Sequence, residues 1–441
     1  MGRALSLATR NTARYTFVNR YLSLSSWRLK ALLRAASSAQ SSERWLAVSV
    51  VSFAFVAFYI STRGNLHAFD YTFRVAAAML HGRVGLVEQP PFWLSEFVPV
   101  DQRYYSVFPL GAIVSMLPVA FLREIGLIHD FPARLIAAVV AASCVYFFFK
   151  LSLLGDNSPG RRVLLGLFPV FGTWTWCNLG FAGAWQIALG LALLGETAAL
   201  YFTLVRPRPL LAGLFFALAV GNRTELLITA PVFLWFWVQR IREERTCHGE
   251  AAVNHNAALR VSGTFFSASA LLLFCTALYN EARFRSALDF GFAHIPKLMQ
   301  EPWYRHGLFS PRAIPWNCYK MLFEGWTDID RFPYLIPHAF GCSIFLASPF
   351  LFLLFREGGH YPVICWTTIA VLTLILWCHG NPGGWQFSYR YAIILLPWMF
   401  LLLAGNGMPK ASATEWSLFS VSLFLNAVAT YQFLWTDRVQ P

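Results

Sequence analysis

Uninterrupted apolar runs of membrane length dominate this 441-residue chain. Runs of about 18 or more apolar residues predict transmembrane helices, because a helix satisfies its own backbone polar groups where no water is present. Charged residues make up only 13% of the chain, about half the share of a soluble domain. The runs do not alternate between apolar and polar residues, which argues against a transmembrane β-barrel. We therefore expect an all-α polytopic membrane protein.

The apolar runs predict a bundle of about ten to twelve transmembrane helices. The first is expected at about 45–60. The others are expected at about 107–122, 133–153, 163–178, 184–204, 209–221, 225–239, 261–280, 338–355, 361–378, 391–404 and 416–435. Together they predict one membrane domain over 45–435, followed by a short tail at 436–441.

Basic residues predict the orientation of this domain. Residues 1–44 contain eight Lys and Arg residues and one acid, which favours a basic cytoplasmic leader; a cleaved organellar transit peptide is the alternative. The loops near 161–162, 206–208 and 240–260 are also basic and expected inside. If the leader and these three loops are all cytoplasmic, one of the apolar runs before residue 240 cannot be an ordinary membrane crossing. That run is either 107–122, or 209–239 taken as one broken helix. The net charge of +13 is thereby assigned to cytoplasmic loops and not to nucleic-acid binding.

Three polar segments, 61–106, 281–337 and 378–391, are expected at the outer face. The first contains four of the 22 acidic residues, and apolar spacing predicts a juxtamembrane helix at 70–80 within it. At its start, Asp70 is a candidate general base or a ligand for Mg²⁺ or Mn²⁺. The structural alternative is an N-cap of the helix. Metal dependence stays open, and we interpret Glu88, Glu96 and Asp101 as ordinary loop charges.

Two arginines at the ends of apolar runs are candidates for binding a phosphate. Charges at such depths usually face a cavity or a partner. Arg223 lies between two runs, and its alternatives are an ion pair with Glu225 or snorkelling. Arg390 opens the run at 391–404 with Tyr389 beside it, and its alternative is an interfacial anchor. No P-loop or dinucleotide-binding motif is present, which argues against an ATP-driven pump.

The sequence resembles the GT-C superfamily of membrane glycosyltransferases, which includes protein mannosyltransferases and the aminoarabinose transferase of lipid A. The finer resemblance is to uncharacterised bacterial members and covers about 45–405. Its motifs are short: Asp70-Tyr71, Tyr104-Tyr105-Ser106, Arg223, Arg283-Phe284 and Trp385 with Ser388-Tyr389-Arg390-Tyr391.

This resemblance implies transfer of a sugar from a polyprenyl-phosphate donor to a glycan, lipid or protein acceptor, at the outer face of the bacterial inner membrane. Asp70 would be the base, with inversion at the anomeric carbon. Arg223, Arg390 and Tyr389 would bind the donor's lipid phosphate. Tyr104, Tyr105 and Trp385, with the aromatic loop 303–334, would shape the sugar and acceptor clefts.

The sequence departs from the GT-C pattern in the number of acids at the first outer loop, and this bears on metal dependence. Many members have two adjacent acids where this chain has only Asp70, which leaves the requirement for a divalent metal undecided.

Several other functions remain open. A transporter or lipid flippase would also carry ionisable residues in its helices. An oligosaccharide ligase or polymerase, or a non-catalytic scaffold, would share much of the expected topology.

Overall fold

The computed structural model describes residues 26–63, 67–246, 255–330 and 334–439. Two compact units divide the chain, Met1–Val50 and Val51–Pro441. The helix α2 (Ser26–Ser61) begins in the first unit and ends in the second, so the leader and first span predicted at 1–44 and 45–60 share one helix over their described residues. Residues 1–25 of that leader and 440–441 of the predicted tail lie outside the described residues.

The described residues are mostly helical, as expected of an all-α protein. The further α-helices are α3 (Tyr71–Leu80), α4 (Leu110–Val114), α5 (Leu117–Glu124), α6 (Ala133–Leu151), α7 (Pro159–Phe171), α8 (Thr175–Gly180), α9 (Ala184–Leu200), α10 (Pro209–Asn222), α11 (Ala230–Thr246), α12 (His255–Phe284), α13 (Ile314–Leu322), α14 (Ile344–Ala347), α15 (Pro362–Trp377), α16 (Leu396–Gly405) and α17 (Ala413–Trp435).

Short helical turns and strands complete the described secondary structure. The 3-10 turns are η1 (Ser152–Leu154), η3 (Thr224–Thr229), η4 (Phe292–His294), η5 (Leu298–Gln300), η6 (Pro302–Tyr304), η7 (Pro311–Ala313), η8 (Pro349–Phe355) and η9 (Arg390–Leu395), and η2 (Tyr201–Val205) is a π-helical turn. Two small antiparallel hairpins pair β1 (Val98–Val100) with β2 (Arg103–Tyr105) and β3 (Thr327–Asp328) with β4 (Leu335–Ile336).

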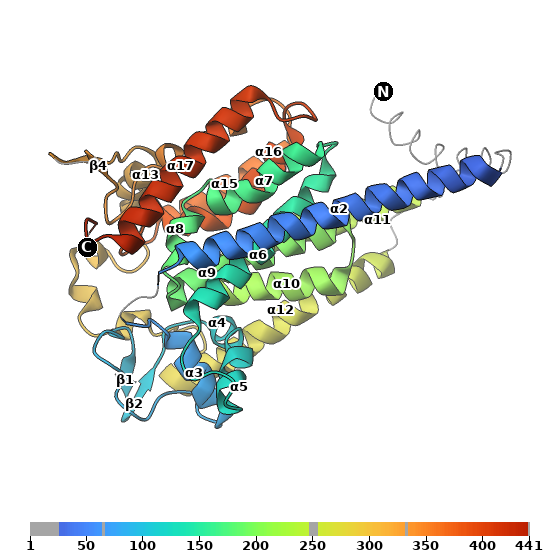
Figure 1. The fold of residues 1–441 in the computed structure, drawn as a ribbon. Coiled ribbons are helices and arrows are strands. Elements are labelled where there is room, and N and C mark those ends of the chain that lie inside the picture. The colour runs from blue at the N-terminus through green and yellow to red at the C-terminus, as the bar shows by residue number, and fades with distance from the viewer. Residues whose placement is uncertain (1–25, 64–66, 247–254, 331–333, 440–441) are drawn as a thin grey trace. The chain divides into compact units, whose positions relative to one another are not determined.

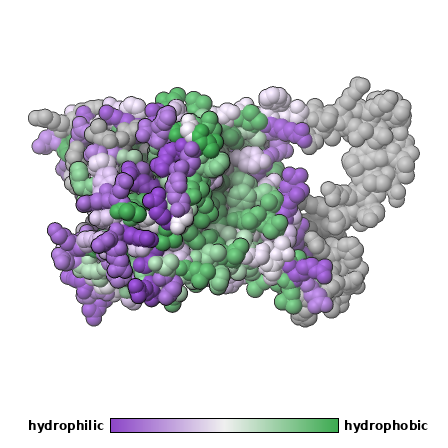
Figure 2. Space-filling model, turned by 90° about the horizontal axis from the view of Figure 1, so that it is seen from below, coloured by the Kyte–Doolittle hydropathy of each residue, from purple (hydrophilic) through white to green (hydrophobic). Residues whose placement is uncertain are grey.

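Five described helical segments are long and apolar enough to cross a membrane: Ser41–Ser61, Ala133–Leu154, Ala184–Val205, Asn256–Phe284 and Ala413–Trp435. Three shorter apolar helices, Pro209–Asn222, Pro362–Trp377 and Arg390–Gly405, accompany them. On the face seen in Figure 2, hydrophobic side chains form a band with hydrophilic ones gathered on either side of it. The structure thus has the character of an all-α membrane protein.

Within Val51–Pro441 the long helices run side by side between two ends (Figure 1). At the loop end, the indoles of Trp176 and Trp435 each donate a hydrogen bond of 2.8 Å to Ser61, and Asn178 donates to the carbonyl of Phe387. The opposite end, here called the anchor end, contains residues 157–161, 403–406 and 412–415. The three segments expected at the outer face, 61–106, 281–337 and 378–391, all connect at the loop end.

The run at 107–122 does not form one helix. It is divided into α4 and α5, and α5 packs against α3 at the loop end. By contrast, 209–239 forms two helices, α10 and α11, separated by η3. Both stretches are therefore interrupted, and the two alternatives left open by the basic loops stay open.

Helix α9 lies at the centre of the bundle, packed against α6, α10 and α16. Its contact with α10 depends on Gly195, because a Cβ there would lie 2.6 Å from the backbone oxygen of Phe215. A Cβ on Gly213 would similarly lie 2.0 Å from the backbone oxygen of Phe265, on α12. Small residues that let helix backbones approach closely are typical of packing inside membranes.

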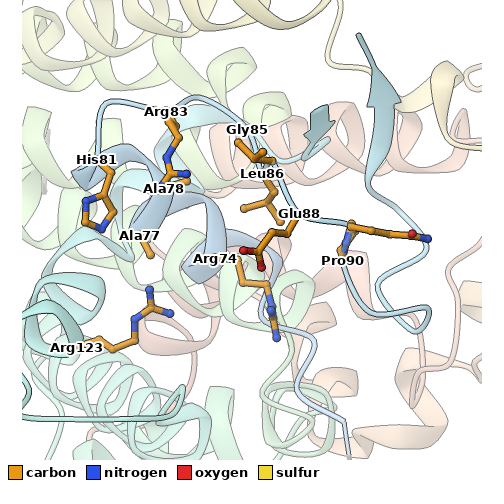
Figure 3. Close-up of a pocket in the computed structure, with 12 residues that line it drawn as sticks. Arg74, Ala77, Ala78, His81, Arg83, Gly85, Leu86, Glu88, Pro90 and Arg123 are labelled. Carbon is orange, nitrogen blue, oxygen red and sulfur yellow. The ribbon is translucent and has the colours of Figure 1, made fainter. Parts of the chain in front are cut away.

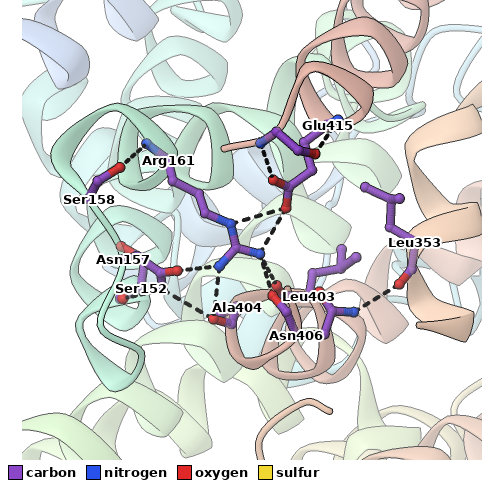
Figure 4. Close-up of polar contacts among 10 residues, drawn as sticks. Ser152, Asn157, Ser158, Arg161, Leu353, Leu403, Ala404, Asn406 and Glu415 are labelled. Carbon is purple, nitrogen blue, oxygen red and sulfur yellow. Dashed lines mark hydrogen bonds and ion pairs between the residues drawn. The ribbon is translucent and has the colours of Figure 1, made fainter. Parts of the chain in front are cut away.

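A buried arginine joins three segments at the anchor end (Figure 4). Arg161 is 2% exposed and donates to Glu415 Oε1 from Nε (3.0 Å) and Nη2 (2.9 Å). Nη2 also donates to the carbonyls of Leu403 (3.0 Å) and Asn406 (2.5 Å), and Nη1 donates to Asn157. The basic sequence at 161–162 is therefore buried in the fold instead of lining an exposed loop.

Replacing Glu415 with Gln is expected to lower the free energy of unfolding by about 3–5 kcal/mol, because the buried guanidinium loses its counter-charge. Glutamine can still form the capping box that Glu415 makes with Ser412, so the change isolates the ion pair. Unfolding of the detergent-purified protein measures the loss. Lys410→Gln, an exposed change in the loop before α17, is the control. An equal effect of the two variants would contradict the assignment.

Candidate functional site

A cavity of about 410 Å³ opens at the loop end. Its lining comes from separate parts of the chain: the segment before α4, the start of α9, the end of α10 with the start of η3, the 290–309 region, and the stretch from the end of α15 to η9. These are Val107, Pro109, Trp185, Asn222, Arg223, Thr224, Glu225, Phe290, Phe292, Phe309, Ile375, Leu376, His379 and Tyr391. We call this space the central cavity. All three segments predicted at the outer face contribute to it or border it.

Arg223 and Arg390, 167 positions apart in the sequence, meet at one ring of the central cavity. The Cζ of Arg223 lies 5.0 Å from the ring centre of Tyr391, and the Cζ of Arg390 lies 5.2 Å from it. The two guanidinium carbons are therefore no more than about 10 Å apart. Cations near an aromatic face are attracted by its quadrupole, so Tyr391 stabilises two like charges close together.

The two arginines differ in how far their donors are satisfied. Arg223, in the extended residue that ends α10, pairs with Glu225 at 2.5 Å. This is the ion pair that the sequence offered as a structural alternative. Arg390 Nη2 donates to the Tyr391 hydroxyl at 3.4 Å, while its buried Nε has no hydrogen-bond partner among the described residues. Arg390, which is not part of the cavity lining, is thus the less satisfied of the two cations.

The carboxylate of Glu96 contacts a residue that lines the central cavity. Trp185, in the cavity lining, donates from Nε1 to Glu96 Oε2 at 2.5 Å. Burial raises the pKa of Glu96, the Glu301 carboxylate raises it further, and the Trp185 bond and the charge of Arg390 partly oppose the shift. Glu96 was interpreted from the sequence as an ordinary loop charge. The structure instead places it where it interacts with Arg390.

Asp70 occupies the N-cap position of α3, yet its side chain makes no capping bond. It accepts instead from Arg74 Nε at 2.7 Å, one helical turn later, and the residue is 5% exposed. Asp70 does not line the central cavity. The pKa of the neighbouring Tyr71 is raised by burial, and the charges of Glu96 and Asp70 contribute to the shift.

Arg74, the partner of Asp70, lines a second cavity of about 370 Å³ (Figure 3). Its charged lining comes from α3, the following loop and α5: Arg74, His81, Arg83, Glu88 and Arg123. Acids beside this cavity offset part of the positive charge, since His81 and Arg123 both contact Glu124 at 3.2 and 3.5 Å. The Asp70–Arg74 pair therefore borders a space of mixed charge.

The other aromatic residues predicted at the site lie outside the lining of the central cavity. Tyr389 is 1% exposed, its hydroxyl donates to the carbonyl of Leu376 at 3.2 Å, and burial raises its pKa. Trp385 packs between Phe181 and Phe433 at ring distances of 5.0 and 5.9 Å. Both side chains contribute to packing, and Tyr391 occupies the cavity position that Tyr389 was predicted to fill.

Tyr104 and Tyr105 lie in β2. The backbone of Tyr104 pairs with Leu86 at 2.9 Å in both directions. Tyr105 is buried and meets the ring of Phe284 edge-on at 6.0 Å. Neither residue lines the central cavity, although Val107, two positions later, does.

Sequence reasoning missed Trp185, Tyr391 and His379 as parts of the site. Tyr391 was available as the neighbour of Arg390. His379 has its pKa lowered by burial, with the charges of Arg223 and Arg390 contributing, and its ring faces Tyr391 at 5.5 Å. No local pattern distinguishes Trp185 from the other 16 tryptophans. Only the folded loop shows its bond to Glu96.

The carboxylates near the site do not form a set of metal ligands. Asp70 is paired with Arg74, Glu225 with Arg223, and Glu96 with an indole donor. No group of three or more His, Cys, Asp or Glu residues suited to a metal ion occurs in the described part of the chain. The arrangement therefore does not fit a Mg²⁺ or Mn²⁺ centre, and we derive no step through a metal.

Comparisons with known proteins do not identify the chain. No family model matches it, and no curated protein or solved structure matches it either.

The raised pKa of Glu96 predicts a pH-dependent stability. Its neutral form is favoured in the fold, so its contribution is complete below the ordinary Glu pKa of 4.5 and is lost as the pH rises through the raised value. Melting temperatures of Glu96→Gln and wild type, compared from pH 4.5 to 7.5, should show the variant gaining stability relative to wild type as pH rises. Glu88→Gln, which removes an exposed carboxylate from the same loop, is the control. A difference between Glu96→Gln and wild type that does not change with pH would contradict this.

Proposed function

We propose that this protein is an integral-membrane glycosyltransferase that moves a sugar from a polyprenyl-phosphate donor to an acceptor at the outer face of a bacterial inner membrane. The observation that carries the proposal is the convergence of Arg223 and Arg390 on Tyr391, at the end of a bundle of apolar helices. A polyprenyl donor keeps its tail in the bilayer and its phosphate at the interface. Such a donor needs no nucleotide-binding domain.

The proposed site binds the lipid phosphate through its two guanidinium groups. Arginine is planar and presents several donors, which suits phosphate oxygens. Arg390 has an Nε without a partner among the described residues, and a phosphate oxygen would satisfy it. Glu96 lies near this cation with a raised pKa. A neutral carboxyl group there would not repel the phosphate.

In the proposed reaction, Asp70 takes a proton from the acceptor hydroxyl. The acceptor oxygen then forms a bond with the anomeric carbon while the bond from that carbon to the phosphate oxygen breaks, with inversion. The phosphate leaves as an anion held by Arg223 and Arg390. Asp70 precedes α3 and forms an ion pair with Arg74. When the donor or the acceptor binds, Asp70 would have to release Arg74 and accept a hydrogen bond from the acceptor hydroxyl instead.

The proposed orientation follows from the two ends of the bundle. The loop end, with the central cavity, would face outward, and the anchor end would face the cytoplasm. In this topology the shorter helices α10, α15 and α16 also cross the membrane, whereas the broken segment at 107–122 stays at the outer face. The acceptor class, a glycan, a lipid or a protein, is left open by this arrangement.

A transporter is the second candidate function, and one observation favours it. Glu196 lies inside the apolar helix α9 and is 0% exposed; it accepts from Trp398 Nε1 at 2.6 Å. Its other oxygen is buried without a partner among the described residues. Ionisable residues inside membranes often belong to transport pathways. Glu196 lies outside the lining of the central cavity, so the glycosyltransferase accounts for more of the converging residues.

Asp70→Asn is expected to lower sugar transfer by about 10²- to 10⁴-fold, the usual contribution of a general base. A deletion strain should lose one sugar from its surface glycans or glycolipids, measured by mass spectrometry. Asp101→Asn should restore that sugar and Asp70→Asn should not, at equal levels in the membrane fraction. Asp101 is a matched control because it lies in the same loop with φ 47°, a conformation that asparagine tolerates.

Two results would count against the proposal in different ways. Restoration by Asp70→Asn would remove Asp70 from the role of base. An unchanged glycan profile in the deletion strain, combined with altered uptake of a solute, would favour the transporter.

Arg223→Ala and Arg390→Ala are each expected to weaken binding of undecaprenyl phosphate by about 10- to 100-fold, since a hydrogen bond to a charged group contributes about 1.5–3 kcal/mol. Thermal stabilisation of the purified protein by added undecaprenyl phosphate measures the affinity. Arg103→Ala, an exposed arginine in β2, should bind as wild type does. Unaltered binding by both Arg223→Ala and Arg390→Ala would exclude this phosphate site.

A further inference from the structure

A third cavity lies beside the central one, in the segment from Pro302 to Trp316. Its volume is about 290 Å³, close to the lower limit for small-ligand pockets. The indoles of Trp303 and Trp316 form part of it, with ring centres 6.2 Å apart and planes inclined by 31°. They are 40% and 44% exposed. Two large flat surfaces are therefore open to a ligand about the size of one sugar ring.

The polar lining of this third cavity is cationic. It contains Arg305, His306 and Arg312 and no carboxylate. Arg312 Nη1 lies 3.3 Å from His306 Nδ1. Within the part of the chain that the structure describes, neither arginine forms an ion pair. Guanidinium groups without a counter-charge suit a carboxylate or a phosphate on the ligand.

One thin wall separates the third cavity from the central one. It consists of residues 308–310 and 378–380, joined by the bonds from Ser310 N to the Cys378 carbonyl (2.7 Å) and from Gly380 N to the Leu308 carbonyl (2.9 Å). Phe309 and His379, also paired across this wall, line the central cavity, whereas Ser310 and Gly380 line the third. The two cavities therefore lie on opposite sides of one pair of hydrogen-bonded segments.

We infer that the third cavity is a subsite for an acidic sugar unit of the acceptor, and thus that the acceptor is an anionic glycan. This inference rests on the proposed function. The apolar C–H face of a pyranose packs on an indole, and the arginines bind the acidic substituent, a uronic carboxylate or a phosphate. The tryptophans supply contact with any sugar, and Arg305 and Arg312 supply the selectivity for charge.

The test compares two ligands with the same sugar units, one carrying free carboxylates and the other carrying methyl esters without charge. Trigalacturonic acid and its methyl ester are titrated by calorimetry into the full-length protein in phosphatidylcholine nanodiscs. Wild type should bind the acid at least 10-fold more tightly than the ester. Arg305→Gln/Arg312→Gln should bind both ligands with the affinity that wild type has for the ester. Trp303→Ala/Trp316→Ala should lose binding of both.

Matched controls separate the subsite from general effects on the protein. Trp416 is as exposed as Trp316, at 44%, but lies at the anchor end, so Trp416→Ala should bind both ligands as wild type does. Arg103→Gln should likewise retain the preference for the acid. Equal affinity of wild type for acid and ester, or a preference that survives Arg305→Gln/Arg312→Gln, would overturn the inference.

Two further arms identify the source of the anion and keep the two proposals distinct. Tryptophan and arginine also anchor proteins at membrane interfaces, so the cavity has to be tested for lipid binding. If nanodiscs that contain phosphatidylglycerol abolish binding of trigalacturonic acid, the cavity binds lipid headgroups and the inference fails. Asp70→Asn should bind trigalacturonic acid as wild type does. If the protein binds trigalacturonic acid with charge selectivity but has no transferase activity, the proposed function is wrong and the anionic subsite remains.

Discussion

The arrangement at the loop end depends on a buried ion pair at the opposite end of the bundle. Arg161 donates to Glu415 at the start of α17 and to the carbonyls at the end of α16. An unpaired guanidinium in this position would cost several kcal/mol, so these segments are held in one register. Helix α16 follows directly from η9, which begins with Arg390. Fixing the far end of this continuous helical segment therefore fixes the height of Arg390 and Tyr391 within the bundle.

Buried and half-buried arginines in this protein differ in how completely their donors are used. At the anchor end, Arg161 has a carboxylate, three backbone carbonyls and an amide within reach. Around the central cavity, Arg223 has one carboxylate and one ring, and Arg390 keeps a buried Nε without a partner among the described residues. Because satisfied cations stabilise a fold and partly satisfied ones attract ligands, this difference separates the structural end from the proposed functional end.

The proposed function places three kinds of chemistry around the loop end. Arg223 and Tyr391 line the central cavity, with Arg390 beside the tyrosine ring. Asp70 precedes the juxtamembrane helix, and an aromatic and cationic cavity lies on the other side of the wall at 308–310. These groups come from different loops. This agrees with the general pattern in which loops carry the binding residues and a rigid scaffold positions them. The proposed donor and acceptor sites thus share one wall and one membrane face.

The sequence by itself determined the apolar helices, the polar segments between them and the arginines at helix ends, because these follow from the cost of polar groups in a bilayer and from local spacing. It predicted the helix at 70–80, which is observed at Tyr71–Leu80. Only the tertiary structure decided which neighbours each side chain has. It turned Tyr389 into the core and Tyr391 into the cavity, paired Asp70 with Arg74, and brought Glu96 to Trp185. These choices depend on contacts between residues far apart in the chain, which no local pattern encodes.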